Sequence, residues 1–65
     1  MKGTVKFFDR NKNYGFINPD EGDEDLFAHA NDIESGLFLG EDDRVEFNSE
    51  EGEKGPKAVN VKKIN

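Results

Sequence analysis

The sequence contains no cysteine, and it has no long run of apolar residues. Without cysteine, neither a disulfide framework nor a thiolate zinc site can stabilise the fold. Without about 20 consecutive apolar residues there is no candidate membrane-spanning helix, and the first residues lack the apolar segment of a secretory signal. The 65 residues are one domain's worth of chain. We therefore expect a single soluble, cytoplasmic domain over residues 1–65, with no membrane partner.

Catalytic groups are also scarce. His29 is the single histidine, and Ser35 and Ser49 are the only serines, so no set of nucleophile, base and orienting residue can be assembled. The acidic run at residues 20–25 suggests calcium, but an EF-hand loop starting there would have Gly22 at its third position and no flanking helices. We expect no enzymatic activity, no metal site and no cofactor.

Basic residues are outnumbered, because 15 acids against 9 bases give a formal charge of -6. Such a charge argues against a nucleic-acid partner, since most polyanion binders are basic. The charge is unevenly distributed, however. Residues 1–19 contain four bases and one acid, residues 20–53 contain fourteen acids and one base, and residues 54–65 contain four bases and no acid. If the two basic ends meet in a sheet, they form a positive strip with the acids elsewhere.

Apolar residues recur with a period of two, and glycine or proline interrupts them about every ten residues, which is typical of short strands joined by turns. The connection at residues 31–43 has Ile33, Leu37 and Leu39 to pack under the sheet, and room for one helical turn at 31–34. Strands are predicted at about residues 2–9, 14–18, 25–30, 44–49 and 57–62. Five antiparallel strands in so short a chain favour a closed all-β barrel, because closure removes exposed strand edges.

Two of these strands separate their side chains by type. Successive side chains of a strand point to opposite faces, so one face carries aromatic and polar-tipped groups and the other carries small and aliphatic ones. The first set is Tyr14, Phe16, Phe27 and His29, and the second is Gly15, Ile17, Leu26 and Ala28.

Either face can form the core. If the aliphatic face is buried, each exposed aromatic gives up roughly 1.5–3 kcal/mol of burial, a loss that indicates a function. If the aromatic face is buried, Tyr14 and His29 each need a buried hydrogen-bond partner. Lys6 and Lys12 lie in the same strand–turn–strand unit as the aromatics, which also counts against burying this face. We favour the aliphatic core, which leaves an aromatic surface for stacking unpaired bases, with cations beside it for phosphates. The predicted members of the aliphatic core are Val5, Ile17, Leu26, Ala28, Val45, Val59 and Val61.

The same segments resemble the cold-shock protein family. Residues 2–8 (KGTVKFF) resemble its opening strand, and residues 12–17 (KNYGFI) and 25–29 (DLFAH) resemble its two ribonucleoprotein motifs. The closing residues 55–61 (GPKAVNV) also match, so the resemblance covers the whole chain in family order. It implies a single cold-shock domain with a five-stranded antiparallel OB-type Greek-key barrel. It also implies a monomer that binds single-stranded RNA and DNA, prefers pyrimidines and acts as an RNA chaperone in the stress response.

The resemblance also implies the residues of the binding site. The residues expected to stack on bases are Phe7, Tyr14, Phe16, Phe27 and His29. Phe8 and Phe38 are expected to flank them, and the expected cationic contacts are Lys6, Lys12 and Lys57. Three positions depart from the family pattern. Phe7 stands where tryptophan is usual, Asn13 where the first motif usually has glycine, and Ala30 where many members have another aromatic.

A competing interpretation is an acidic protein-interaction module or a polyanion mimic that presents residues 20–53 to a basic partner. Such a protein needs no exposed aromatic surface and does not bind oligonucleotides. Stacking is worth roughly 1–3 kcal/mol per base, so an acidic protein can still bind through its aromatics. For the nucleic-acid interpretation we therefore expect weak binding that is led by stacking and tolerates salt.

Overall fold

The computed structural model describes residues 1–22, 24–34, 39–53 and 55–64. Its elements are β1 (Lys2–Asp9), β2 (Tyr14–Pro19), β3 (Leu26–His29), the short 3-10 helix η1 (Ala30–Asp32), β4 (Arg44–Gly52) and β5 (Gly55–Lys63). All five predicted strands are present, although β4 and β5 both run further into their connecting turn than predicted. The helical turn begins one residue earlier than predicted. Within the described ranges, no helix has the length and apolar character to cross a membrane.

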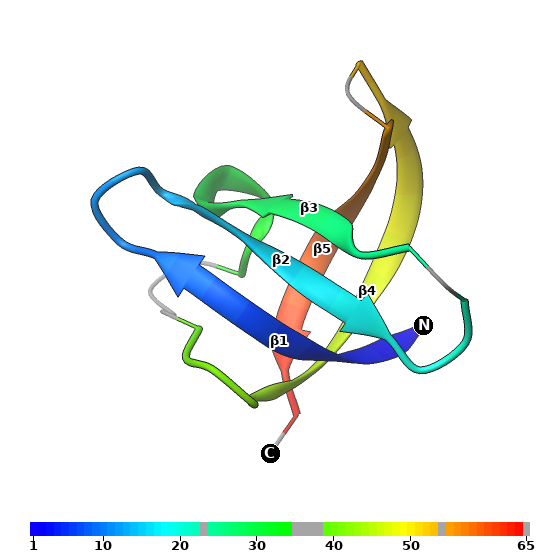
Figure 1. Cartoon of the computed structure of the whole chain (residues 1–65), viewed down its shortest axis with the longest axis horizontal. Coiled ribbons are helices and arrows are strands. Elements are labelled where there is room, and N and C mark those ends of the chain that lie inside the picture. The colour runs from blue at the N-terminus through cyan, green and yellow to red at the C-terminus, as the bar shows by residue number, and fades with distance from the viewer. Residues whose placement is uncertain (23, 35–38, 54, 65) are drawn as a thin grey trace.

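The strands close into a barrel in the order β1-β2-β3-β5-β4 (Figure 1). The closed all-β barrel is therefore confirmed. Four neighbouring pairs are antiparallel, but β3 and β5 are parallel, which differs from the predicted all-antiparallel arrangement. An odd number of strands in a ring cannot alternate direction throughout, so one parallel pair is unavoidable.

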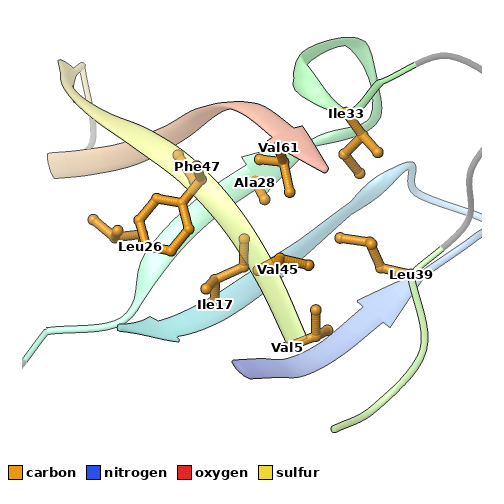
Figure 2. Close-up of a cluster of buried hydrophobic side chains, with 10 residues drawn as sticks. Val5, Ile17, Leu26, Ala28, Ile33, Leu39, Val45, Phe47 and Val61 are labelled. Atoms are coloured by element: carbon orange, nitrogen blue, oxygen red, sulfur yellow. The ribbon is translucent and has the colours of Figure 1, made fainter. Parts of the chain in front are cut away.

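The barrel interior is aliphatic, as predicted. Buried side chains form one cluster, most of which is labelled in Figure 2. Its members are Val5, Ile17, Leu26, Ala28, Ile33, Leu39, Val45, Phe47, Ala58 and Val61. Val59 is also buried, at 9% exposure. The sequence prediction omitted Phe47, whose ring is 2% exposed and lies within this cluster. Leu37 lies outside the described residues.

The two basic ends of the chain do not form a strip. Because β4 lies between β1 and β5 on one side of the barrel, its acidic residues separate the two ends. The register places Lys2 opposite Glu46 and Glu46 opposite Lys62, and the Lys62 Nζ atom lies 3.5 Å from Glu46 Oε1. The condition for a basic strip is thus not met, because β1 and β5 are not neighbours, and on this side of the barrel opposite charges alternate across the strands.

Candidate nucleic-acid interface

The outer face of β1, β2 and β3 is formed by aromatic side chains, and a β-bulge brings the first of them there. The register pairs Val5 with Ile17 and Phe7 with Phe16, so Lys6 is an extra residue in β1. Strict alternation would place Val5 and Phe7 on the same face. The bulge instead lets Val5 point inward, at 1% exposure, and Phe7 outward, at 38%.

Five rings form the aromatic platform, which comprises Phe7, Tyr14, Phe16, Phe27 and His29. Phe16 lies opposite Phe27 and Tyr14 opposite His29 in the β2–β3 ladder. The ring centres of Phe16 and Phe27 are 5.9 Å apart, and those of Tyr14 and Phe27 are 5.5 Å apart. Phe7 adjoins Phe16 at 5.6 Å, and His29 adjoins Phe27 at 6.4 Å. The structure therefore brings all five predicted stacking residues onto one continuous, solvent-accessible surface.

The turn between β1 and β2 holds one end of this platform. The Asp9 Oδ1 atom accepts hydrogen bonds from the backbone N–H groups of Asn11 and Lys12, at 2.9 and 3.1 Å. Asn13 has a φ of 61°, in the left-handed region, and its carbonyl accepts the Ala30 N–H at 2.8 Å. Asparagine tolerates this conformation better than most residues, and glycine tolerates it without strain. The conformation therefore explains why asparagine can stand where the family that the sequence resembles usually has glycine.

The ring of His29 is held by the start of η1. Its Nδ1 atom accepts a hydrogen bond from the Asn31 backbone N–H at 3.1 Å. In the neutral ring the proton then sits on Nε2, which makes that nitrogen a donor. The edge of His29 that carries Nε2 is thus available to a base or a phosphate oxygen.

The predicted cations lie on β1, on the β1–β2 turn and on β5, and they are not equivalent. The Lys6 Nζ atom lies 2.9 Å from Asp25 Oδ2, while 61% of the Lys6 side chain remains exposed. Lys12 lies exposed in the β1–β2 turn. Lys57 pairs with Phe27 in the parallel β3–β5 contact, so it lies at the edge of the platform formed by β3. Of these three lysines, Lys6 alone forms an ion pair with a carboxylate among the described residues.

Two hollows adjoin the platform. The larger, about 590 Å³, is lined by Tyr14, Phe16, Glu24, Asp25, Phe27 and Pro56. The smaller, about 270 Å³, is lined by Phe27, Gly52, Glu53, Gly55 and Lys57. Three acids therefore border the aromatic surface, and the expectation that the acids lie elsewhere is wrong. Glu53 reaches Phe27 only through the pairing of β3 with β5, which is not a local feature of the sequence. Glu24 and Asp25 directly precede β3, and alternation already places Asp25 on the face of Phe27.

One of the two predicted flanking residues, Phe8, is not on the platform. Phe8 is half-buried and packs against the core, because the bulge at Lys6 turns it inward. Phe38 lies outside the described residues. Within the described part of the chain, no group of three or more histidine, aspartate or glutamate side chains is placed to hold a metal ion.

Known proteins match the chain along almost its whole length. Residues 1–64 match the family model described as "'Cold-shock' DNA-binding domain". The chain is 48% identical over 63 residues to the cold shock-like protein CspG of Escherichia coli strain K12, and 49% identical over 63 residues to the cold shock-like protein CspJ of Salmonella typhi. Each alignment covers 94% of this chain and 90% of the relative.

A solved structure shares the fold. The chain described as "drosophila Unr CSD456" aligns with a TM-score of 0.81 at 23% identity. The alignment covers 98% of this chain and 26% of the Drosophila chain, which is therefore much longer. At this level of identity the similarity establishes the barrel architecture alone.

Proposed function

The chain belongs to the cold-shock domain family, and from this membership we propose that it binds single-stranded RNA and DNA by stacking unpaired bases on its aromatic platform. One observation carries the proposal: five rings from three strands lie together on an accessible face, although burying such rings would stabilise a small domain. Base–aromatic stacking of this kind tolerates sequence variation, because every base has a π-face.

The cations position the backbone of the ligand. Lys6, Lys12 and Lys57 flank the rings, so a strand whose bases lie on Phe16 and Phe27 has its phosphates within reach of positive charge. Lys6 exchanges its contact with Asp25 for a phosphate. Bases in a duplex are already stacked on each other and cannot lie on the rings. Single strands are therefore preferred, and the protein acts as an RNA chaperone by trapping melted segments through mass action.

Finer features rest on family membership rather than on geometry. We propose that residues 1–65 act as one cold-shock domain, monomeric and cytoplasmic, and that the domain prefers pyrimidines. We also propose that it has no enzymatic activity, since the family is a binding family and a single histidine offers little for catalysis.

The aromatic platform can be tested by comparing phenylalanines in different environments. Phe16→Ala and Phe27→Ala should each weaken binding of a labelled oligopyrimidine by about 1–3 kcal/mol, or roughly 5- to 150-fold, because one base loses its stacking partner. Both variants should remain folded, since these rings are partly exposed. Fluorescence anisotropy measures affinity, and circular dichroism with thermal melting checks the fold.

The matched control is Phe47→Ala, which removes a ring that is 2% exposed. It should destabilise the barrel by about 3–5 kcal/mol. Wild-type affinity in both platform variants, or unfolding as severe as that of Phe47→Ala, would contradict the proposal. A wild-type protein that binds no oligonucleotide would favour the acidic interaction module instead.

A further inference from the structure

The strand β4 extends beyond the strand that covers one of its edges. β1 pairs with β4 over residues 44–46, and Met1 adds one further pair. The Phe47 N–H donates to the Met1 carbonyl at 2.8 Å, and the Met1 amino group donates to the Phe47 carbonyl at 2.9 Å. Beyond Phe47, β4 continues to Gly52 with β5 as its partner on the other edge. This part of the β4–β5 hairpin projects from the barrel (Figure 1).

The alternation of an antiparallel ladder identifies which backbone groups are exposed. Because Phe47 exchanges both hydrogen bonds with Met1, its N–H and carbonyl face the β1 side. The same groups of Ser49 and Glu51 face that side too, while those of Asn48 and Glu50 face β5. Among the described residues, no backbone group bonds Ser49 or Glu51 from the β1 side. Residues 48–51 are all exposed, so this segment is an open strand edge.

We propose that this open edge binds an extended, basic segment of a partner protein by β-strand addition. An added strand would take up the backbone groups of Ser49 and Glu51, as peptides do at exposed sheet edges elsewhere. Glu50 and Glu51 point to opposite faces of β4, so two adjacent lysine or arginine residues of the partner would lie opposite them, one on each face. The occupant that fits is therefore a dibasic extended segment.

The charge around the edge favours this occupant. Glu53 follows in the hairpin turn and adds negative charge beyond Glu51. At the other end, Met1 and Asn48 border a hollow of about 650 Å³ whose lining also includes Asp32, Glu34, Glu46 and Lys62. A basic strand along the edge would thus meet Glu53 at one end and, at the other, three carboxylates that outnumber Lys62 and the Met1 ammonium group.

A second copy of this chain fits the edge poorly. Two copies could pair their edges antiparallel so that the backbone groups of Ser49 and Glu51 form hydrogen bonds between the copies. The two-fold axis then passes through Glu50, so the two Glu50 side chains face each other. Like charges directly opposite in a ladder are destabilising. The acids thus protect the edge from self-association, a common use of charge on edge strands, while leaving it suited to a cationic strand.

The probe is an acetylated and amidated peptide, TVKRVT, titrated into the 15N-labelled full chain. The amide resonances of Ser49 and Glu51 should shift, and their hydrogen exchange should slow, because they gain hydrogen bonds. The backbone amides of Asn48 and Glu50 already face β5, so their resonances and exchange rates should change less. Two control peptides should bind at least about tenfold more weakly. One is TVEEVT, and the other is TVKRVT methylated on the amide nitrogens of the lysine and of the second valine.

A protein variant tests the edge directly. Ser49→Pro removes an N–H that faces solvent, and an edge strand tolerates proline at such a position. The variant should bind the peptide at least about tenfold more weakly, because one hydrogen bond to the added strand is lost. If this variant does not fold, the methylated peptide still decides the matter. Phe16→Ala should bind the peptide as the wild type does, because Phe16 does not line the hollow that Phe27 shares with Gly52 and Glu53, so failure of this proposal is distinct from failure of the aromatic platform.

Three results would overturn the proposal. One is equal binding of the methylated peptide, which would reduce the interaction to charge alone. Another is a set of peptide-induced shifts centred on Tyr14 and Phe16. The third is sedimentation of the peptide-free protein as a dimer with protected Ser49 and Glu51 amides, which would assign the edge to a second copy.

Discussion

At Gly15 the backbones of β1 and β2 approach so closely that no side chain fits. A Cβ atom there would lie 2.2 Å from the Phe7 carbonyl oxygen and 2.8 Å from the Phe8 Cα atom. Both are backbone atoms and cannot rotate away. Gly15 lies between Tyr14 and Phe16, so the same contact sets the position of two platform rings.

Gly15→Ala should therefore destabilise the barrel by about 1–3 kcal/mol, the usual effect of overpacking. Urea denaturation measures the change. The variant should also bind oligonucleotides more weakly under conditions where it remains folded, because β1 must move away from Phe16. The matched control is Gly40→Ala, where the nearest atom to a Cβ is Asp43 Oδ2 at 3.5 Å. Equal stability of the two variants would refute this account of Gly15.

At the level of elements, an ion pair joins the end of β2 to β4 and β1. The guanidinium of Arg44 donates to both carboxylate oxygens of Asp20, at 2.7 and 2.6 Å, and its Nη1 also donates to Thr4 Oγ1 at 2.8 Å. The hydrogen bond from Arg44 lowers the pKa of Asp20 below its ordinary value of 3.8. The contact is exposed, so its contribution to stability is small.

This shift gives a pH dependence of definite sign. A carboxyl whose pKa is lower in the folded state stabilises the fold above its ordinary pKa of 3.8, and that stabilisation disappears as the pH falls through the lower, folded value. Asp20→Asn should therefore lower the urea midpoint at about pH 6, and the difference from wild type should shrink near pH 2. Glu21→Gln, a neighbouring exposed acid outside this ion pair, is the control. A deficit that is constant across pH would contradict this origin.

Sequence patterns predicted the strands and the faces of β2 and β3, because alternation is a local property. Alternation fails at the two bulges, since a bulge is defined by the partner strand. One is at Lys6. The other lies where the register of β4 and β5 shifts, near Asn60, whose φ is 53°. The first bulge decides that Phe7 joins the platform and Phe8 the core. Phe47 is a different case, because it lies two residues after Val45 in β4 and alternation places it on the buried face, although the prediction omitted it.

Considered as a whole, the molecule is small relative to the reach of its own charges at low salt. Its principal extents are 25 × 25 × 17 Å, and its radius of gyration is 10.2 Å. At physiological ionic strength the Debye length is about 8 Å, so most acids are screened from a strand on the platform. Glu24, Asp25 and Glu53 border the platform itself, however, and remain within reach. The formal charge of -6 therefore does not exclude binding, but the bordering acids should weaken it, most of all at low salt.

The dependence of affinity on salt should show both effects. A basic single-strand binder gains affinity on dilution with a slope of about -0.7 per phosphate contact in a log–log plot. Here the slope should be shallower, because Lys6 already holds Asp25. It should flatten further near 0.01 M salt, where the Debye length of about 30 Å exceeds the width of the molecule and all the acids repel the ligand.

Removing the charges that border the platform tests whether repulsion by these acids causes the shallow salt dependence. The double variant Glu24→Gln, Glu53→Gln should bind a labelled oligopyrimidine more tightly than wild type, with the gain largest at low salt, because both carboxylates line hollows beside the rings. Glu34→Gln removes an exposed acid that lines neither hollow, and should change affinity less. Anisotropy titrations from about 0.01 to 0.5 M salt measure all three proteins. The wild type could instead give a straight log–log plot of affinity against salt with the full counterion-release slope, and the double variant the same plot. That result would show that the acids at the edge of the platform do not affect the ligand.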